Sequence, residues 1–233
     1  MVIIKVSKLS EIYSFMRYWI LMLLTMACAH CRQPKSNILI VGDSISIGYT
    51  PYVQKNLADL AEVIHNPGNA EHTGTGVDSI VTWVGNKDWD IILFNWGLWD
   101  LCYRHPDSNV QGHRDKINGT ITLSVDEYGD NLDSIITLIR NRSTAELIFV
   151  TTTYVPKMEA GRYQEDVIKY NDKAKSILNK RGVTILDIYD NSILIHRQYG
   201  KGNDDVHYSE EGYKKLGDQI SDFLKQEIQH RRY

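Results

Sequence analysis

The chain has 233 residues, of which 42% are hydrophobic and 24% are charged, a balance typical of a folded globular protein. Its 26 lysines and arginines against 29 aspartates and glutamates give a formal net charge of −3, without the basic blocks that bind a phosphate backbone. The composition therefore argues against nucleic acid as a partner, and the length suits one α/β domain behind an N-terminal segment.

Residues 1–36 have the pattern of an export signal with a short tether. Arg17 precedes an apolar run, Tyr18 to Cys28, that is too short for a comfortable membrane span. We expect Met16 to be the true start of the chain, because the residues before it add nothing that an export signal needs. The run ends in Leu-Thr-Met-Ala-Cys, which resembles a loose bacterial lipoprotein box with Cys28 as the lipidated residue. We expect an exported protein, either periplasmic or tethered to the membrane by an N-terminal lipid; the alternative is an uncleaved N-terminal anchor.

The three cysteines provide no disulfide framework. Cys28 and Cys31 lie in or beside the signal, so Cys102 is the lone thiol of the predicted mature protein. No pattern near Cys102 would activate it, and we expect a small buried residue.

Residues 37–233 form the predicted domain, in which short apolar runs alternate with amphipathic stretches. This alternation favours a parallel sheet covered by helices on both faces, a three-layer α/β/α fold with a five-stranded parallel sheet. The predicted strands are Asn37 to Val41, Glu62 to His65, Asp90 to Trp96, Glu146 to Thr152 and Val183 to Ile188. The predicted helices are Pro51 to Leu60, Gly76 to Val84, Val125 to Arg140, Tyr163 to Arg181 and Ser209 to Gln229.

One long polar connection, Leu101 to Leu123, interrupts this alternation. A loop of that length in a compact domain is usually functional or disordered. Arg104 and Arg114 within it are open to two interpretations, contact with an anionic substrate or solvated surface charge, and we favour the second. The spacing of four other residues matches no recognised metal site, so we expect no metal there: His105, Asp107, His113 and Asp115.

The strongest local motif is a buried strand that runs into Gly42-Asp43-Ser44 and then into a helix. This order places Ser44 at the carboxyl edge of the sheet, where open α/β folds bind their ligands. The Ser44 N–H points out of a helix start and can stabilise a developing oxyanion. We predict that Ser44 is a nucleophile and that Asp43 supports the turn behind it; the alternative for Ser44 is a helix N-cap.

A serine needs a base, and the second motif provides one just before the last predicted helix. Asp204 and His207 are three residues apart, so one turn can hold the carboxylate against the imidazole while the other ring nitrogen faces Ser44. We therefore predict the triad Ser44, Asp204 and His207. The adjacent Asp205 is interpreted as a solvated or capping carboxylate.

Taken together, these motifs resemble the SGNH (GDSL-type) hydrolase family over residues 37–228. The first block matches as Gly42 to Ser46, and the last as Asp204 to His207 followed by Glu211-Gly212-Tyr213; Tyr170-Asn171 is similar to a pair common in the family. The resemblance implies a flavodoxin-like sheet, no metal or organic cofactor, and hydrolysis of ester or thioester bonds through an acyl-enzyme.

The second family block, which supplies a glycine N–H to the oxyanion hole, corresponds here to Asn66 through Thr73. Gly68 is its only glycine near the expected turn, with Ala70 or Glu71 as alternative N–H donors. We take Gly68 and Asn69 as the oxyanion or substrate-binding candidates of this block.

The third block, Gly-x-Asn-Asp in the family, reads Asn95 to Asp100 here, and Trp99 stands where the family has asparagine. Alternation in an extended segment places Asn95 and Trp99 on one face, so Asn95 can reach the same region. Trp99 donates only through its indole N–H, and its ring can line the pocket and stack on a sugar or acyl group.

The predicted function is that of a serine esterase whose substrate is a carbohydrate O-acetyl ester or another small ester. We expect the enzyme to be a monomer. The choice of an acetyl group and of a carbohydrate rests on the family resemblance and on the export signal. Alternative enzymes are a lysophospholipase, a thioesterase or an acyltransferase. An alternative from another functional class is a non-catalytic glycan-binding protein, which the altered third block supports.

Overall fold

The computed structural model describes residues 34–231. The predicted export signal, including Met16 and Cys28, lies outside the described residues. Within residues 34–231, no helix is long and apolar enough to cross a membrane.

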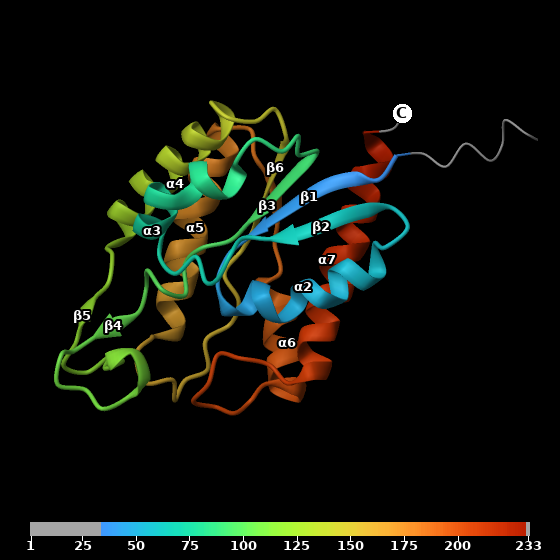
Figure 1. Cartoon of the computed structure of the whole chain (residues 1–233). Helices are drawn as coiled ribbons and strands as arrows, with labels where there is room; N and C mark the ends of the chain where they lie inside the picture. The colour runs from blue at the N-terminus through green and yellow to red at the C-terminus, as the bar shows by residue number, and fades with distance from the viewer. Residues whose placement is uncertain (1–33, 232–233) are drawn as a thin grey trace, which may run out of the picture. The chain divides into compact units, whose positions relative to one another are not determined.

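A five-stranded parallel sheet forms the centre of the domain (Figure 1). Its strands are β1 (Ser36–Val41), β2 (Ala61–His65), β3 (Ile91–Phe94), β6 (Glu146–Val150) and β7 (Thr184–Leu186). Their order, β2-β1-β3-β6-β7, is that of a flavodoxin-like sheet. All four side chains of β3 are buried, as expected for a strand covered on both faces. The predicted fold class is confirmed.

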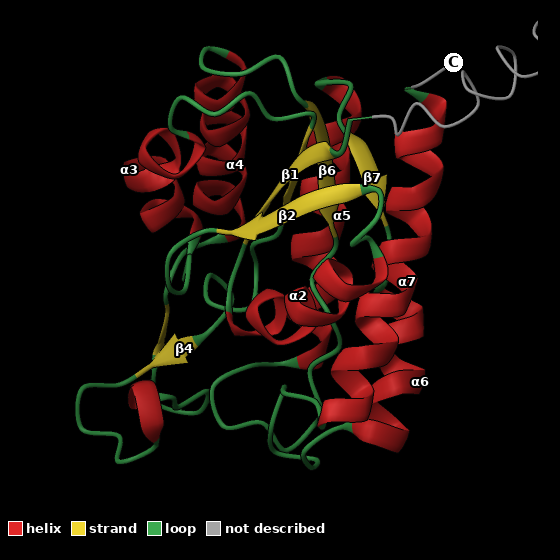
Figure 2. Cartoon of the chain, turned by 45° about the vertical axis from the view of Figure 1, so that its right-hand side comes forward, coloured by secondary structure: helices red, strands yellow, loops and turns green. Residues whose placement is uncertain are grey.

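Helices cover both faces of the sheet (Figures 1 and 2). One layer packs α3 against α4 and α4 against α5, and the other packs α2 and α6 against α7. The bounds are α2 (Ser44–Asn56), α3 (Thr73–Val84), α4 (Val125–Arg140), α5 (Gln164–Lys180), α6 (Tyr189–Tyr199) and α7 (Glu210–His230).

Two helices differ from the expectation. Helix α2 starts at Ser44 because the Asp43 side chain caps it, so Pro51 lies inside the helix and not at its start. Helix α6 was not predicted. Only Ser192 and His196 are buried in it, so it carries no apolar stripe from which a helix could be recognised.

The long polar connection is ordered and forms a small substructure, which we call the hairpin insertion (residues 101–123). It contains β4 (Tyr103–Arg104) paired antiparallel with β5 (Thr120–Ile121), and the short 3₁₀ helix η1 (Gln111–His113) between them. Backbone hydrogen bonds join it to the loop between β6 and α5: the Tyr103 N–H donates to the Gly161 carbonyl (2.7 Å), and the Lys116 N–H to the Ala160 carbonyl (2.8 Å). The insertion is therefore held next to the carboxyl edge of the sheet.

Candidate active site

The Gly-Asp-Ser turn positions Ser44 at the carboxyl end of β1. Gly42 leaves no room for a side chain, since a Cβ there would lie 2.7 Å from the Ser46 Oγ. Asp43 is the N-cap of α2, and its Oδ1 accepts the Ile45 N–H at 2.9 Å. Because Asp43 does the capping, the Ser44 hydroxyl is left for a different partner.

That partner is His207, whose Nε2 lies 2.9 Å from the Ser44 Oγ. The opposite ring nitrogen, Nδ1, lies 2.5 Å from Oδ1 of Asp205, which also accepts the His207 backbone N–H at 2.9 Å. Burial alone would raise the pKa of Asp205, but the hydrogen bonds from His207 outweigh it and hold that pKa below its usual value. The three side chains form a serine, histidine and carboxylate relay.

The prediction of Asp204 as the carboxylate is wrong. Asp204 is exposed, whereas the Asp205 side chain turns inward and accepts both the backbone and the ring N–H of His207. This local ring, closed two residues along the chain, is the turn that aspartate side chains favour. Sequence spacing could not choose between two adjacent carboxylates, because the choice depends on the loop conformation.

In the third block, Asn95 differs from expectation and Trp99 lies where its ring was expected. The Asn95 Nδ2 donates to the Val150 carbonyl at 2.7 Å, so its amide joins the ends of β3 and β6 and the prediction of Asn95 as an oxyanion donor is wrong. The glycine of this block is required structurally: Gly97 has φ +145°, and a Cβ there would lie 2.1 Å from the Thr152 Oγ1. Trp99 is half-exposed and lines the pocket beside Ser44.

In the second block, Gly68 is exposed and does not line the pocket, contrary to expectation. The Ala70 N–H donates to the Gly42 carbonyl (2.9 Å), and the Glu71 N–H to the Asn69 Oδ1 (2.8 Å), so both backbone donors are engaged. Asn69 does line the pocket. Among the described residues, neither its Nδ2 nor the Ser44 N–H has another hydrogen-bond partner, and these two donors remain for an oxyanion.

Asp100 fixes the second block to the third. Its Oδ1 accepts the N–H and the hydroxyl of Thr73 at 2.8 and 2.6 Å, which orders the start of α3. Burial raises the pKa of Asp100 to about 6, although the bonds from Thr73 lower it.

Tyr170-Asn171, the other family-like pair, is also structural: the Asn171 amide makes two hydrogen bonds to the Thr152 backbone (2.8 and 3.0 Å).

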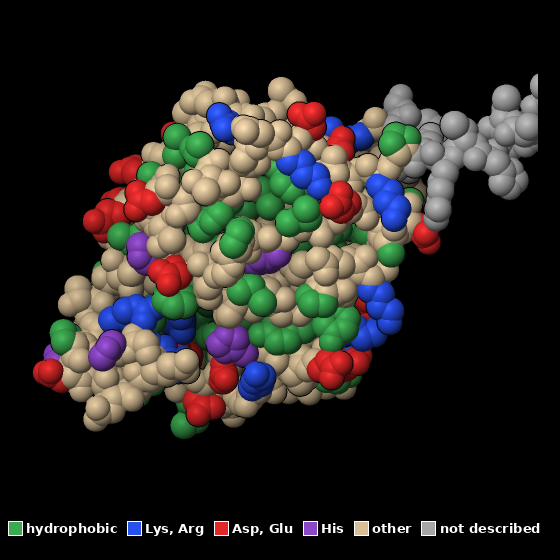
Figure 3. Space-filling model, viewed as in Figure 1, with side chains coloured by type: hydrophobic (Ala, Val, Ile, Leu, Met, Phe, Trp, Pro, Cys, Tyr) green, Lys and Arg blue, Asp and Glu red, His purple; other side chains and the backbone are tan. Residues whose placement is uncertain are grey.

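Ser44 and His207 open into a pocket of about 400 Å³, the size of a small-ligand site. Of the described residues that line it, only Leu98, Trp99 and Val206 have apolar side chains. Figure 3 shows a hollow on this face between Lys and Arg side chains on one side and a histidine on the other. The side chains that line the pocket are therefore mostly polar, although apolar atoms make up the larger part of its exposed wall.

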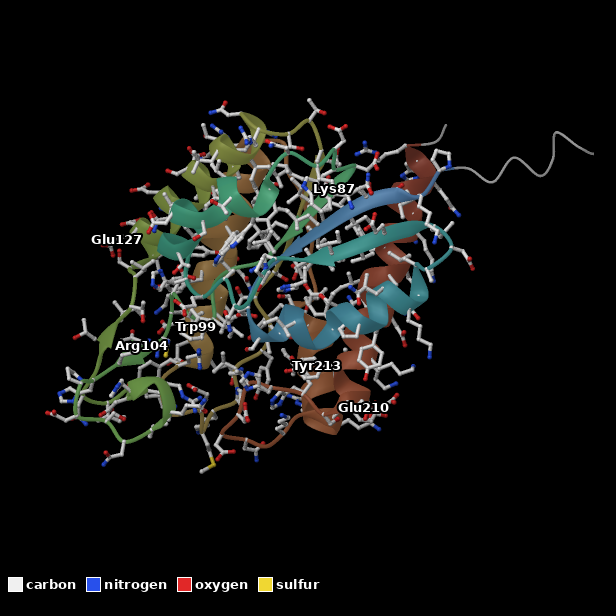
Figure 4. All side chains as sticks on the ribbon, viewed as in Figure 1. Lys87, Trp99, Arg104, Glu127, Glu210 and Tyr213 are labelled. Carbon is white, nitrogen blue, oxygen red and sulfur yellow. The ribbon has the colours of Figure 1, made fainter. Side chains whose placement is uncertain are left out.

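The hairpin insertion and the following loop bring arginines to this pocket. The Arg104 guanidinium lies over the Trp99 ring at 4.8 Å from its centroid, and Figure 4 shows the two residues side by side. Arg104 and Arg114 line the pocket, which favours contact with a substrate over the interpretation as solvated surface charge alone. Arg162 also lines it and was missed, because it follows β6 in a loop with no recognisable motif.

The remaining candidates carry no chemistry that the geometry supports. Among residues 34–231, no three His, Cys, Asp or Glu side chains are grouped so that they could hold a metal ion. Cys102 is fully buried, as expected, and burial raises the pKa of its thiol.

Comparison with known proteins places these features in a family. A model of the GDSL-like lipase/acylhydrolase family matches residues 38–220. No curated protein matches the sequence at a significant level.

Solved structures share the fold at low sequence identity. A lipase/acylhydrolase from Enterococcus faecalis has a TM-score of 0.64 and 19% identity over 82% of this chain and 96% of its own. An acetylxylan esterase from Geobacillus stearothermophilus has a TM-score of 0.63 and 15% identity over 81% and 94%. The acetyl xylan esterase AlAXEase has a TM-score of 0.61 and 16% identity over 79% and 97%. With the family match over most of the domain, the chain belongs to the GDSL-like lipase/acylhydrolase family and is a carboxylic ester hydrolase.

Proposed function

We propose that the protein is a serine hydrolase that forms an acyl-enzyme at Ser44 and removes acetyl groups from a carbohydrate. The observation that carries this proposal is the relay of Ser44, His207 and Asp205 in the lining of a pocket of about 400 Å³. A binding protein has no need of a hydroxyl held 2.9 Å from an imidazole that is itself oriented by a carboxylate.

In the first half-reaction, the Ser44 Oγ attacks the ester carbonyl while His207 Nε2 takes the hydroxyl proton. Asp205 stabilises the imidazolium that forms. The Ser44 N–H and the Asn69 Nδ2 are the donors available to the oxyanion of the tetrahedral intermediate. His207 then gives its proton to the leaving alcohol, and the acyl group stays on Ser44. Water, activated by His207, releases the acid and restores the hydroxyl.

The walls of the pocket support a short acyl group. A long acyl chain, as in a lysophospholipid or a fatty thioester, needs an extended apolar channel, whereas only three of the described residues that line this pocket, Leu98, Trp99 and Val206, have apolar side chains. The half-exposed ring of Trp99 offers a face on which a sugar can stack. The two acetylxylan esterases of the same fold are consistent with this choice. An acyltransferase would use the same acyl-enzyme with a sugar hydroxyl in place of water.

We also propose that the reaction takes place outside the cytoplasm. Arg17 and the apolar run that ends at Cys28 support export, and Cys28 is the proposed site of lipid attachment.

The test combines a serine-directed fluorophosphonate with 4-nitrophenyl acetate. We expect the probe to label Ser44 and the ester to be hydrolysed, and we expect Ser44→Ala to abolish labelling and lower kcat by at least about 10³-fold. The control is Ser134→Ala, which changes an exposed serine on α4 and should keep both activities. If the wild-type protein is neither labelled nor active, the glycan-binding alternative is favoured.

A further inference from the structure

One wall of the active-site pocket is built from guanidinium groups. Arg104 comes from β4, Arg114 follows η1, and Arg162 lies in the loop before α5, and all three line the pocket that contains Ser44. Two of these segments belong to the hairpin insertion. The sheet and its helices are complete without the insertion, so its arginines are an addition to the catalytic fold.

The charges of this wall are not balanced within it. Arg114 and Arg162 share one carboxylate oxygen, Glu159 Oε1, at 2.6 and 2.8 Å, and Glu159 is fully buried. Its other oxygen accepts the Gly161 N–H at 2.7 Å. Arg104 has no carboxylate partner among the described residues: it donates to the Gly112 carbonyl and to the Thr122 hydroxyl. Among the described residues, Glu159 is therefore the one carboxylate that forms ion pairs with this wall.

The two other carboxylates that line the pocket have different tasks. Asp205 is paired with His207. Asp43 is buried under the turn as the cap of α2, where burial raises its pKa and the charge of Arg162 offsets part of that effect, so Arg162 is partly balanced by Asp43 whereas Arg104 is not. The Nη2 groups of Arg104 and Arg114 donate to none of the described residues. Both guanidinium groups therefore keep unused N–H donors toward the pocket, and an anionic group of the substrate would accept from them where a neutral one would not.

We propose that the substrate carries a negative group close to the scissile ester, a carboxylate of the kind found in uronic acids, and that Arg104 and Arg114 bind it. This inference rests on the proposed function, since it names the substrate class of the same site. A planar carboxylate matches the fork of donors that guanidinium groups present. The Trp99 ring, one face of which is covered by the Arg104 guanidinium, provides an apolar surface beside this charge for the sugar that carries the carboxylate.

The test compares an anionic and a neutral sugar ester, the 1-O-methyl glycosides of glucuronic acid and of glucose, each acetylated at all three secondary ring hydroxyls. They differ only in the carboxylate. We expect kcat/KM for acetate release to be at least about tenfold higher for the glucuronide, the value of one charge-assisted contact. Arg104→Gln and Arg114→Gln should each lower this ratio, and the double variant should bring it close to one. Arg104→Lys should keep part of it because the charge remains.

The control is Arg142→Gln, which removes an arginine that lies outside the active-site pocket and donates to the Gly85 carbonyl and the Asn86 amide oxygen; it should leave the ratio unchanged. Thermal unfolding checks that each variant is folded. A glucoside sulfated at the primary hydroxyl distinguishes recognition of a carboxylate from recognition of any anion; if it reacts as well as the glucuronide, an anionic substrate is still supported.

Two failures are distinguishable. If Ser44 is labelled and 4-nitrophenyl acetate is cleaved, but both sugar esters react equally, the anionic substrate is refuted while the hydrolase stands. If Ser44 neither reacts with the probe nor turns over 4-nitrophenyl acetate, the proposed function itself is refuted.

Discussion

The assignment of the triad carboxylate can be tested by changing two adjacent aspartates separately. Asp205→Asn removes the charge that lies 2.5 Å from the His207 Nδ1, whereas Asp204→Asn removes an exposed carboxylate from the same loop. The two variants have the same change in composition and net charge. Only the first should impair catalysis.

The size of the effect follows from the geometry. A carboxylate and an imidazolium with charge centres about 4 Å apart attract by about 4 kcal/mol at an effective dielectric constant of about 20, and by about 1 kcal/mol in water. The side chains of His207 and Asp205 are 34% and 37% exposed, so solvent screens part of this attraction and about 3 kcal/mol is expected. That corresponds to about 10²-fold in kcat. An asparagine that also stabilises the wrong histidine tautomer can increase the loss to about 10⁴-fold.

The assay is steady-state hydrolysis of 4-nitrophenyl acetate near pH 7.5, with kcat and KM determined separately and folding checked by circular dichroism. Asp205→Asn should lower kcat with little change in KM, because the carboxylate acts on the transition state. Asp204→Asn should stay within about threefold of the wild type. A loss confined to Asp204→Asn, or equal in both variants, would refute the assignment.

Three further predictions concern the oxyanion hole, the pH dependence of stability and the N-terminus. Asn69→Ala should lower kcat by about 10²–10³-fold with little effect on KM. Asn95→Ala should instead lower the free energy of unfolding by about 1–3 kcal/mol. A large loss of kcat in Asn95→Ala, together with a loss of stability in Asn69→Ala, would contradict this. The pKa of Asp100 is raised to about 6 in the folded state, above its unfolded value of about 3.8, so the folded state binds this proton more tightly. The free energy of unfolding should therefore fall by about 3 kcal/mol as the pH rises from about 4 to about 7. Asp100→Asn should remove this decline, and parallel wild-type and variant curves in urea unfolding would exclude it. In the native host, mass spectrometry should find a mature chain that starts near Cys28 and partitions with membranes, and Cys28→Ser should release it; an intact N-terminus would count against cleavage.

The amino-acid sequence determined the elements whose signals are local. Helix α4 was predicted with its observed bounds, and its signals are local: in the structure Ser124 and Glu127 form a capping box in front of an apolar stripe. The nucleophile turn was equally clear, since a buried strand, a glycine and a capping Asp43 are consecutive in the chain and place Ser44 by backbone geometry alone.

The tertiary structure decided everything that depended on side-chain direction or on distant segments. The inward turn of Asp205 in place of Asp204 is set by the loop before α7. The Asn95 amide is taken by a carbonyl of a neighbouring strand, 55 positions further along the chain. The arginine wall forms only because Arg162 and the hairpin insertion meet across the carboxyl edge of the sheet. A local pattern predicts backbone conformation, but which partner satisfies a buried polar group is determined by the packing of the whole domain.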